Sequence, residues 1–251
     1  MNLKREAEDL DNKIFKIKRK RFSGLPDSLI EMALKKAKDD EKEAKAILRK
    51  YFGVFLTNKV LKADDEKILR MHISSKNRHY KELYKKIFNK KAKSVIDIGC
   101  GVNGFSYSIL FEEAGRINYV GIEAIKQLVD KMNKFFDSRG YCAKAIWGDV
   151  FDFDKIKKIV KNSEKPAVIF MFNLIDALEF FEKDSSQKLI NEISHDSDRI
   201  VLSFSLKSLS GKKRFEAQRK WIIHFIEDNF EILDDFEISG ERFLIFKNKK
   251  N

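Results

Sequence analysis

The stretch SVIDIGCGVNG, residues 94–104, decides the fold. Its first half is a short apolar run that ends in glycine, which is typical of a buried parallel strand. Gly99, Gly101 and Gly104 then complete a G-x-G-x-x-G pattern directly after that strand. This pattern indicates a loop that binds a nucleotide cofactor, but alone it fits either a dinucleotide or S-adenosylmethionine.

Strands and helices are expected to alternate after residue 94. A buried strand is predicted at 94–99, further strands at 117–123, 167–175 and 199–206, a strand and turn at 142–150, and helices at 126–140, 185–194 and 212–229. This alternation predicts a doubly wound α/β fold around a mostly parallel sheet. Two further apolar runs, 230–238 and 241–247, flank a Ser-Gly turn and predict a terminal antiparallel hairpin.

The first third of the chain has a different pattern. Its apolar residues, such as Leu29, Met32 and Ala33, recur at helical spacing, and no strand pattern occurs before residue 94. We therefore predict two domains: a basic helical domain of residues 1–90 and an α/β domain of residues 91–251.

Charge is also distributed unevenly. Lys and Arg total 51 and Asp and Glu total 39, a net charge of +12. Residues 1–90 hold 25 basic and 14 acidic side chains, whereas residues 91–251 hold 26 and 25. This asymmetry favours a polyanionic partner for the first third, the alternative being a solvated helical surface. The densest basic patch is KIFKIKRKRF, residues 13–22.

Several classes of protein are disfavoured. Cys100 and Cys142 lie far apart and form no metal-ligand spacing, so we expect no metal site. No apolar run approaches the roughly 18 residues that a membrane span needs. The N-terminal MNLKREAEDLDNK lacks the apolar region of a signal peptide. We expect a cytoplasmic monomer that is not attached to a membrane.

The choice of cofactor depends on carboxylates at the strand ends. Asp97 lies two residues before Gly99, where a carboxylate suits the ammonium of S-adenosylmethionine but not a pyrophosphate. Glu123 ends the second strand and can accept both ribose hydroxyls of either cofactor. Asp149 follows the third strand and is a candidate for the adenine amino group. With the terminal hairpin, these residues favour S-adenosylmethionine and a Rossmann-like class I methyltransferase fold with a seven-stranded, mostly parallel sheet.

Three segments carry a more specific resemblance. MHISSKNRHYKELYKKIF (71–88), LSFSLKSLSGKKRFEAQRKW (202–221) and ISGERFLIF (238–246) are similar to segments of the aminoglycoside-resistance 16S rRNA (guanine-N7) methyltransferases, the Arm/Rmt/FmrO-like group. SLKSLSGK is the most specific of these matches, because the fold does not require it. The resemblance implies an S-adenosylmethionine-dependent enzyme that modifies the small ribosomal subunit and confers antibiotic resistance.

The resemblance also implies roles for individual residues. Arg78 would meet the cofactor carboxylate, and a guanidinium suits that task because it pairs with a carboxylate through two hydrogen bonds. The full set expected on the cofactor side is Arg78, Asp97, Gly99, Gly101, Glu123, Asp149 and Asn173.

On the substrate side, Lys207 and Ser208 match residues near the target nucleotide, whereas a structural role is expected for His72 and Ser74. Guanine N7 carries a free lone pair, so we expect positioning by Lys207 and Ser208 and no general base. The phosphates of 16S rRNA would be contacted by Lys16, Lys18, Arg19, Lys20 and Arg21.

The chain departs from the family pattern around the substrate. Gly104 replaces a proline, Asn173 replaces a lysine, Asp176 replaces another proline, and K-K-R-F-E replaces G-K-G-M-E at 212–216. Three alternatives therefore stay open: methylation of another RNA, methylation of adenine N1, or a non-catalytic RNA-binding factor for ribosome assembly.

Overall fold

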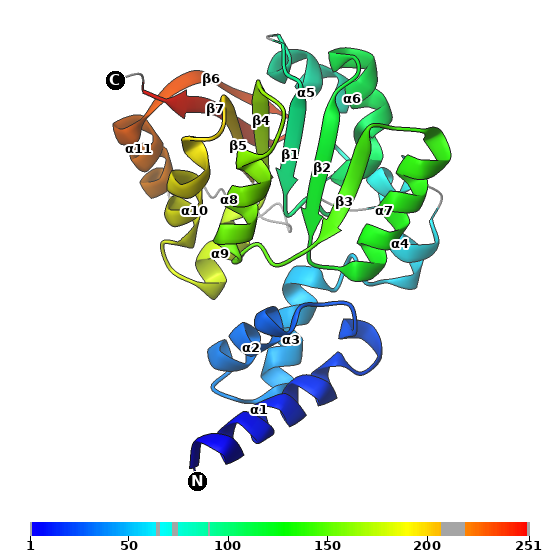
Figure 1. Ribbon diagram of the computed structural model, residues 1–251, viewed down its shortest axis with the longest axis vertical. Coiled ribbons are helices and arrows are strands. Elements are labelled where there is room, and N and C mark those ends of the chain that lie inside the picture. The colour runs from blue at the N-terminus through cyan, green and yellow to red at the C-terminus, as the bar shows by residue number, and fades with distance from the viewer. Residues whose placement is uncertain (1, 64–65, 72–74, 90, 207–218, 250–251) are drawn as a thin grey trace.

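A seven-stranded sheet forms the centre of the computed structural model, which describes residues 2–63, 66–71, 75–89, 91–206 and 219–249 (Figure 1). The strand order is β3-β2-β1-β4-β5-β7-β6. The strands are β1 (Ser94–Ile98), β2 (Asn118–Glu123), β3 (Ala143–Trp147), β4 (Ala167–Phe172), β5 (Arg199–Ser205), β6 (Phe230–Ile238) and β7 (Glu241–Asn248). β1 to β5 are parallel, and β7 lies antiparallel between β5 and β6. The predicted class I fold with its terminal hairpin is confirmed.

Helices cover both faces of the sheet. Buried residues of α5 (Tyr80–Ile87), α6 (Tyr107–Ala114) and α7 (Lys126–Arg139) share one core with the Val95 face of β1. On the Ile96 face lie α8 (Phe153–Lys161), α9 (Ile175–Phe181), α10 (Ser185–Ser194) and α11 (Lys220–Asn229). All five residues of β1 are buried, which explains why Val95, Ile96 and Ile98 are apolar on both faces of the strand.

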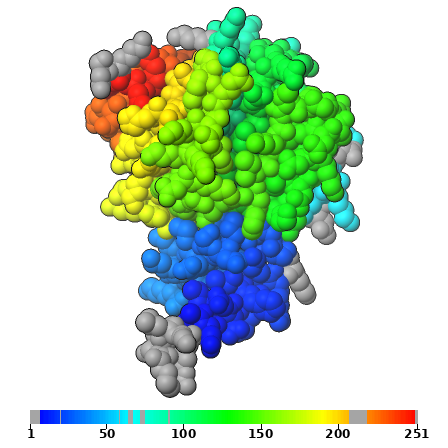
Figure 2. All heavy atoms as spheres, viewed as in Figure 1, coloured from blue at the N-terminus to red at the C-terminus, as the bar shows by residue number. Residues whose placement is uncertain are grey.

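The N-terminal helices α1 (Asn2–Lys18), α2 (Asp27–Lys36) and α3 (Glu41–Phe52) form a separate layer beyond the carboxyl ends of β1 to β3 (Figure 1). Asp40 caps α3, because its side chain accepts a hydrogen bond from the backbone of Glu43. α4 (Asn58–Lys62) contacts α7, and short 3-10 turns lie at Lys20–Phe22, Glu66–Arg70 and Asn103–Ser106. Figure 2 shows this layer protruding from the larger α/β body.

The core nevertheless runs through both parts. Leu25 and Leu29 of the helical layer are buried in the same hydrophobic cluster as Val95 of the sheet. The indole nitrogen of Trp147 donates to the carbonyl of Gly24 at 2.9 Å. The N-terminal helices are therefore packed onto the sheet. None of the described helices is long and apolar enough to cross a membrane.

Some predicted boundaries were wrong. The strand expected at 167–175 ends at Phe172, because Asn173 takes a left-handed conformation with φ 53° and α9 begins at Ile175. The strand and turn expected at 142–150 are present, with β3 ending at Trp147 and the turn following it. Of the helix expected at 212–229, the structure describes Lys220–Asn229, while 212–218 lie outside the described residues.

Candidate cofactor site

The glycine loop after β1 is built from two residues that need to be glycine. Gly99 and Gly101 have φ values of 66° and 52°, which other residues rarely adopt. A Cβ on Gly99 would also lie 2.8 Å from a methyl group of Leu174. Gly104 has a different role, since a Cβ there would lie 2.7 Å from the sulfur of Met132. Its small size serves packing beneath the loop.

Glu123 joins the loop to the end of β2. Its Oε2 accepts the N–H of Gly101 at 2.8 Å, and its Oε1 accepts the N–H of Ile125 at 3.0 Å. Burial raises the pKa of Glu123, although these backbone donors act in the opposite direction. Each carboxylate oxygen can accept a second hydrogen bond, so the group remains suited to a pair of ribose hydroxyls.

Asp97 carries an unsatisfied buried oxygen. Its Oδ2 accepts from Asn103 Nδ2 at 2.6 Å and from the Tyr119 hydroxyl at 2.8 Å. Its Oδ1 is buried and has no hydrogen-bond partner within the part of the chain that the structure describes. Burial raises the pKa of Asp97 to about 6, although both hydrogen bonds and the charge of Arg78 lower it. A buried carboxylate oxygen without a donor is costly, so this position suits a cationic ligand group.

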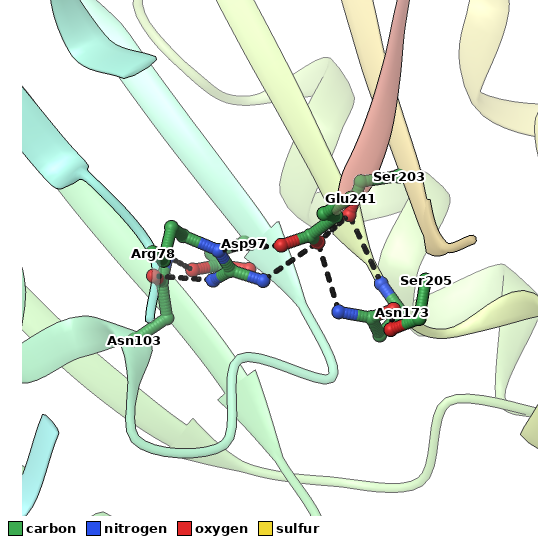
Figure 3. Close-up of polar contacts among 7 residues, drawn as sticks. All are labelled: Arg78, Asp97, Asn103, Asn173, Ser203, Ser205 and Glu241. Carbon is green, nitrogen blue, oxygen red and sulfur yellow. Dashed lines mark hydrogen bonds and ion pairs between the residues drawn. The ribbon is translucent and has the colours of Figure 1, made fainter. Parts of the chain in front are cut away.

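Arg78 faces the same loop (Figure 3). Its guanidinium forms a bidentate pair with Glu241, with Nε 3.0 Å from Oε2 and Nη2 2.8 Å from Oε1. Its Nη1 donates to Asn103 Oδ1 at 3.3 Å. Burial lowers the pKa of Arg78, but the charge and hydrogen bonds of Glu241 together with the nearby Tyr80 and Tyr84 outweigh this effect, and the net shift is upward. Arg78 is therefore a fixed, buried cation beside the loop.

Asn173 extends this network to the end of β4. Its Nδ2 donates to Glu241 Oε1 at 2.8 Å, and its Oδ1 accepts from the Ser205 hydroxyl at 3.1 Å. Ser203 also donates to Glu241 Oε1. The structure thus brings Asn173 together with Arg78 through Glu241, a residue that sequence reasoning missed. The only signal for it was its place in the ISGERFLIF segment.

A pocket of about 400 Å³ opens beside Arg78. Four of its eight lining residues are basic and none is acidic: Lys67, Leu69, Arg70, Ser75, Lys76, Arg78, Tyr80 and Ile109. The buried hydroxyl of Tyr80 finds no hydrogen-bond partner in the described ranges. The pocket therefore favours an anionic group, such as a carboxylate.

Asp149 lies where the helical layer meets the sheet. Its Oδ1 accepts the N–H of Phe151 at 2.9 Å, and its Oδ2 accepts from the hydroxyl of Ser28 in α2. Burial raises the pKa of Asp149. The helical layer therefore contacts directly the carboxylate that was expected near the adenine, and the sequence did not indicate this contact.

The predicted RNA-binding residues lie elsewhere, around the end of α1. Lys16 pairs with Glu41 at 3.3 Å, and Lys18 pairs with Asp27. The guanidinium of Arg19 lies over the ring of Phe15, and Arg21 donates a hydrogen bond to the carbonyl of Gly53. The side chain of Lys20 lies outside what the structure describes, as do residues His72, Ser74, Lys207 and Ser208.

One departure from the family pattern has a local partner. Asp176, which stands in place of a proline, forms an ion pair with Arg219, and Arg219 also donates to the carbonyl of Ser205. The Arg219 side chain is 7% exposed. This ion pair ties the start of α9 to the residue just before α11.

The strand order and the glycine loop flanked by Asp97 and Glu123 define a class I methyltransferase fold. Among solved structures, the chain is similar to the 16S rRNA methylase RmtB, with a TM-score of 0.76 and 21% identity over 96% of this chain and 98% of that chain. The chain is also similar to an rRNA methylase from Escherichia coli, with a TM-score of 0.75 and 20% identity over 96% of this chain and 100% of that chain. The 16S rRNA methyltransferase RmtF, in complex with S-adenosyl-L-homocysteine, has a TM-score of 0.74 and 18% identity over 96% of this chain and 98% of that chain.

No family model matches the chain. A curated relative, the 16S rRNA (guanine(1405)-N(7))-methyltransferase of Proteus mirabilis, is 27% identical over 192 residues. The matched stretch covers 71% of this chain and 63% of the relative, which is less than two thirds of that protein's length. These findings confirm the resemblance to the Arm/Rmt group of 16S rRNA methyltransferases.

Proposed function

We propose that this chain is an S-adenosylmethionine-dependent methyltransferase that methylates guanine N7 in the decoding region of 16S rRNA. The observation that carries the cofactor assignment is the unpartnered Oδ1 of Asp97 beside the buried cation of Arg78. An amino acid end, with its ammonium and carboxylate, complements that pair of charges. The Proteus mirabilis relative, a 16S rRNA (guanine(1405)-N(7))-methyltransferase, supports the choice of base.

Each cofactor residue has a defined task in this proposal. Asp97 holds an ammonium, Arg78 a carboxylate, and Glu123 two ribose hydroxyls. Asp149 faces the adenine amino group, and Asn173 orders the edge of the site next to Arg78. When bound, S-adenosylmethionine supplies a methyl group on a sulfonium.

The acceptor side requires positioning and the exclusion of water. Guanine N7 has a free lone pair, so no side chain has to remove a proton from it. Lys207 and Ser208 are proposed to hold the target nucleotide. A base that is stacked in an RNA helix must turn outward to reach such a site.

Within the predicted domain of residues 1–90, the layer of α1 to α3 is proposed to dock on the ribosome, whereas α5 and Arg78 belong to the packing of the sheet and the cofactor site. The basic side chains at the end of α1 would supply affinity through phosphates and would not choose the base. We further propose that the protein acts as a monomer on the small subunit in the cytoplasm, and that the methylation confers aminoglycoside resistance.

The test is to incubate purified small subunits with the protein and a labelled methyl donor, and then to map the label. A 7-methylguanosine is cleaved by aniline after reduction, so one new cleavage site in the decoding region is expected. Label without cleavage, together with a reverse-transcription stop, would instead indicate adenine N1. Label on another RNA would show that the substrate is not 16S rRNA, and no label at all would favour a non-catalytic assembly factor.

A further inference from the structure

Glu241 is the most highly connected side chain of the site. It is the first residue of β7, and its side chain is only 8% exposed. Its two oxygens accept four hydrogen bonds, from Arg78 Nε, Arg78 Nη2, Asn173 Nδ2 and the Ser203 hydroxyl (Figure 3). These donors come from three separate parts of the chain, so one carboxylate ties them together.

We propose that Glu241 is a positioning residue that orients Arg78 toward the carboxylate of the cofactor and fixes Asn173 beside it. This inference rests on the proposed S-adenosylmethionine-dependent function. Glu241 acts through Arg78 and does not itself contact the cofactor.

The hydrogen-bond inventory of Arg78 supports this role. A guanidinium has five N–H groups in a rigid fork. Glu241 takes two of them along the Nε–Nη2 edge, and Asn103 takes one on Nη1. These three hydrogen bonds, which are those made with described residues, leave one N–H on Nη1 and one on Nη2. Such a pair suits a second carboxylate through two hydrogen bonds.

The sheet register explains how Glu241 reaches the site. β7 runs antiparallel to β5, and Glu241 is paired with Ser205 at the carboxyl end of β5. This end lies beside the end of β4, where Asn173 leaves the sheet. A shift of the register by one residue would turn the Glu241 side chain to the other face of the sheet. The terminal hairpin therefore contributes a site residue as well as closing the sheet.

The test compares binding of S-adenosylmethionine by calorimetric titration in four proteins: wild type, Glu241→Gln, Arg78→Ala and the double variant. Glu241→Gln keeps the size of the side chain but loses the charge that holds the guanidinium. Because charge-assisted hydrogen bonds are lost, we expect its affinity to fall about tenfold or more. If Glu241 acts through Arg78, adding Glu241→Gln to Arg78→Ala should cause a much smaller loss than Glu241→Gln causes alone, the remainder being the contribution of Asn173.

A matched control lies on the same hairpin. Glu231 forms an exposed ion pair with Lys247 at 3.1 Å, so Glu231→Gln removes the same charge without touching the site. Its affinity should equal that of the wild type. Thermal unfolding of all variants separates a loss of fold from a loss of orientation.

A second variant covers the case in which Glu241→Gln does not fold. Ser203→Ala removes one donor to Glu241 and should weaken binding roughly two- to threefold, since one of four restraints is lost. Wild-type affinity in Ser203→Ala or Glu241→Gln, or additive losses in the double variant, would overturn the role of Glu241. A wild-type protein that binds no S-adenosylmethionine would instead overturn the proposed function.

Discussion

The ion pair of Arg78 with Glu241 and the ion pairs at the end of α1 differ in how much water reaches them. The side chains of Arg78 and Glu241 are 4% and 8% exposed, whereas those of Lys16 and Glu41 are 57% and 30% exposed. Breaking a buried pair leaves an uncompensated charge and costs several kcal/mol. An exposed pair contributes about 0–1 kcal/mol, because water and salt replace it.

This difference suits the two regions to different kinds of ligand. A buried guanidinium with a fixed orientation can select one small carboxylate by geometry. The exposed Lys16 and the half-buried Lys18 of α1 can exchange their carboxylate partners for phosphates at little cost. The ion pairs of Lys16 with Glu41 and of Lys18 with Asp27 are therefore compatible with the proposed RNA contacts.

The largest expected effect is that of Arg78→Ala. Affinity for S-adenosylmethionine should fall roughly 10- to 150-fold, because charge-assisted hydrogen bonds are worth about 1.5–3 kcal/mol. The free energy of unfolding should also fall by about 3–5 kcal/mol, since Glu241 is left buried without its cation. Calorimetry and urea unfolding measure the two losses separately.

Lys16→Ala serves as the exposed counterpart of that variant. It should change the free energy of unfolding by no more than about 1 kcal/mol and leave cofactor affinity intact. Equal losses of stability in the two variants would break the distinction between buried and exposed pairs. Unchanged cofactor affinity in Arg78→Ala would refute the carboxylate assignment.

A smaller effect is expected from pH, through Asp97. Burial raises the pKa of Asp97 to about 6 from an ordinary 3.8, so the carboxyl gains a proton as the pH falls through 6. A neutral carboxyl cannot pair with an ammonium, and affinity for S-adenosylmethionine should therefore fall about tenfold between pH 7 and pH 5. The contribution to folding has the opposite sign: because the folded pKa is raised, protonation favours the folded state, and this contribution is lost as the pH rises through about 6.

Asp97→Asn is the control for this pH dependence. It should bind weakly and with nearly the same affinity at both pH values, because it has no proton to gain. Burial also raises the pKa values of Glu123 and Asp149. Comparing Asp97→Asn with the wild type therefore shows which part of the pH dependence comes from Asp97 and which part from these two carboxyls. A wild-type affinity that is equal at pH 5 and pH 7 would show that Asp97 does not hold the ammonium.

The parts of the site that could be predicted from the sequence are those with a local signature. The run SVIDIG indicated a buried strand, and Gly99 and Gly101 indicated a tight loop after it. Asp97 and Glu123 stand at strand ends, where parallel strands deliver side chains to one edge of the sheet. The structure brings all four together.

The contacts that escaped prediction depend on tertiary packing. Glu241 meets Arg78 across 163 residues of sequence, and this contact depends on the register between β5 and β7. The contact of Ser28 with Asp149 likewise requires the helical layer to dock on the sheet. Composition revealed the charge of α1, but not that Lys16 and Lys18 have carboxylate partners.

The packing also determines how the docking proposal has to be tested. Leu25 and Leu29 are buried in the core shared with the sheet, and Trp147 bonds to the backbone of Gly24. Deleting the first 60 residues would therefore expose core and disturb the surroundings of Asp149. Substitutions of exposed lysines test RNA contact without that damage.

The smallest effect is expected from the paired substitution Lys16→Ala with Lys18→Ala, measured as binding to small subunits across a range of salt concentrations. Each lost phosphate contact lowers the salt slope by about 0.7–0.9, so the slope should fall by roughly 1.4–1.8. Raising the salt from 50 to 200 mM should then cost the variant about tenfold less affinity than it costs the wild type. Cofactor affinity should not change. The matched control is Lys157→Ala with Lys188→Ala, which removes the same charge from two exposed, paired lysines of α8 and α10. If both paired variants lower the slope equally, the protein responds to its total charge, and the end of α1 has no special part in docking.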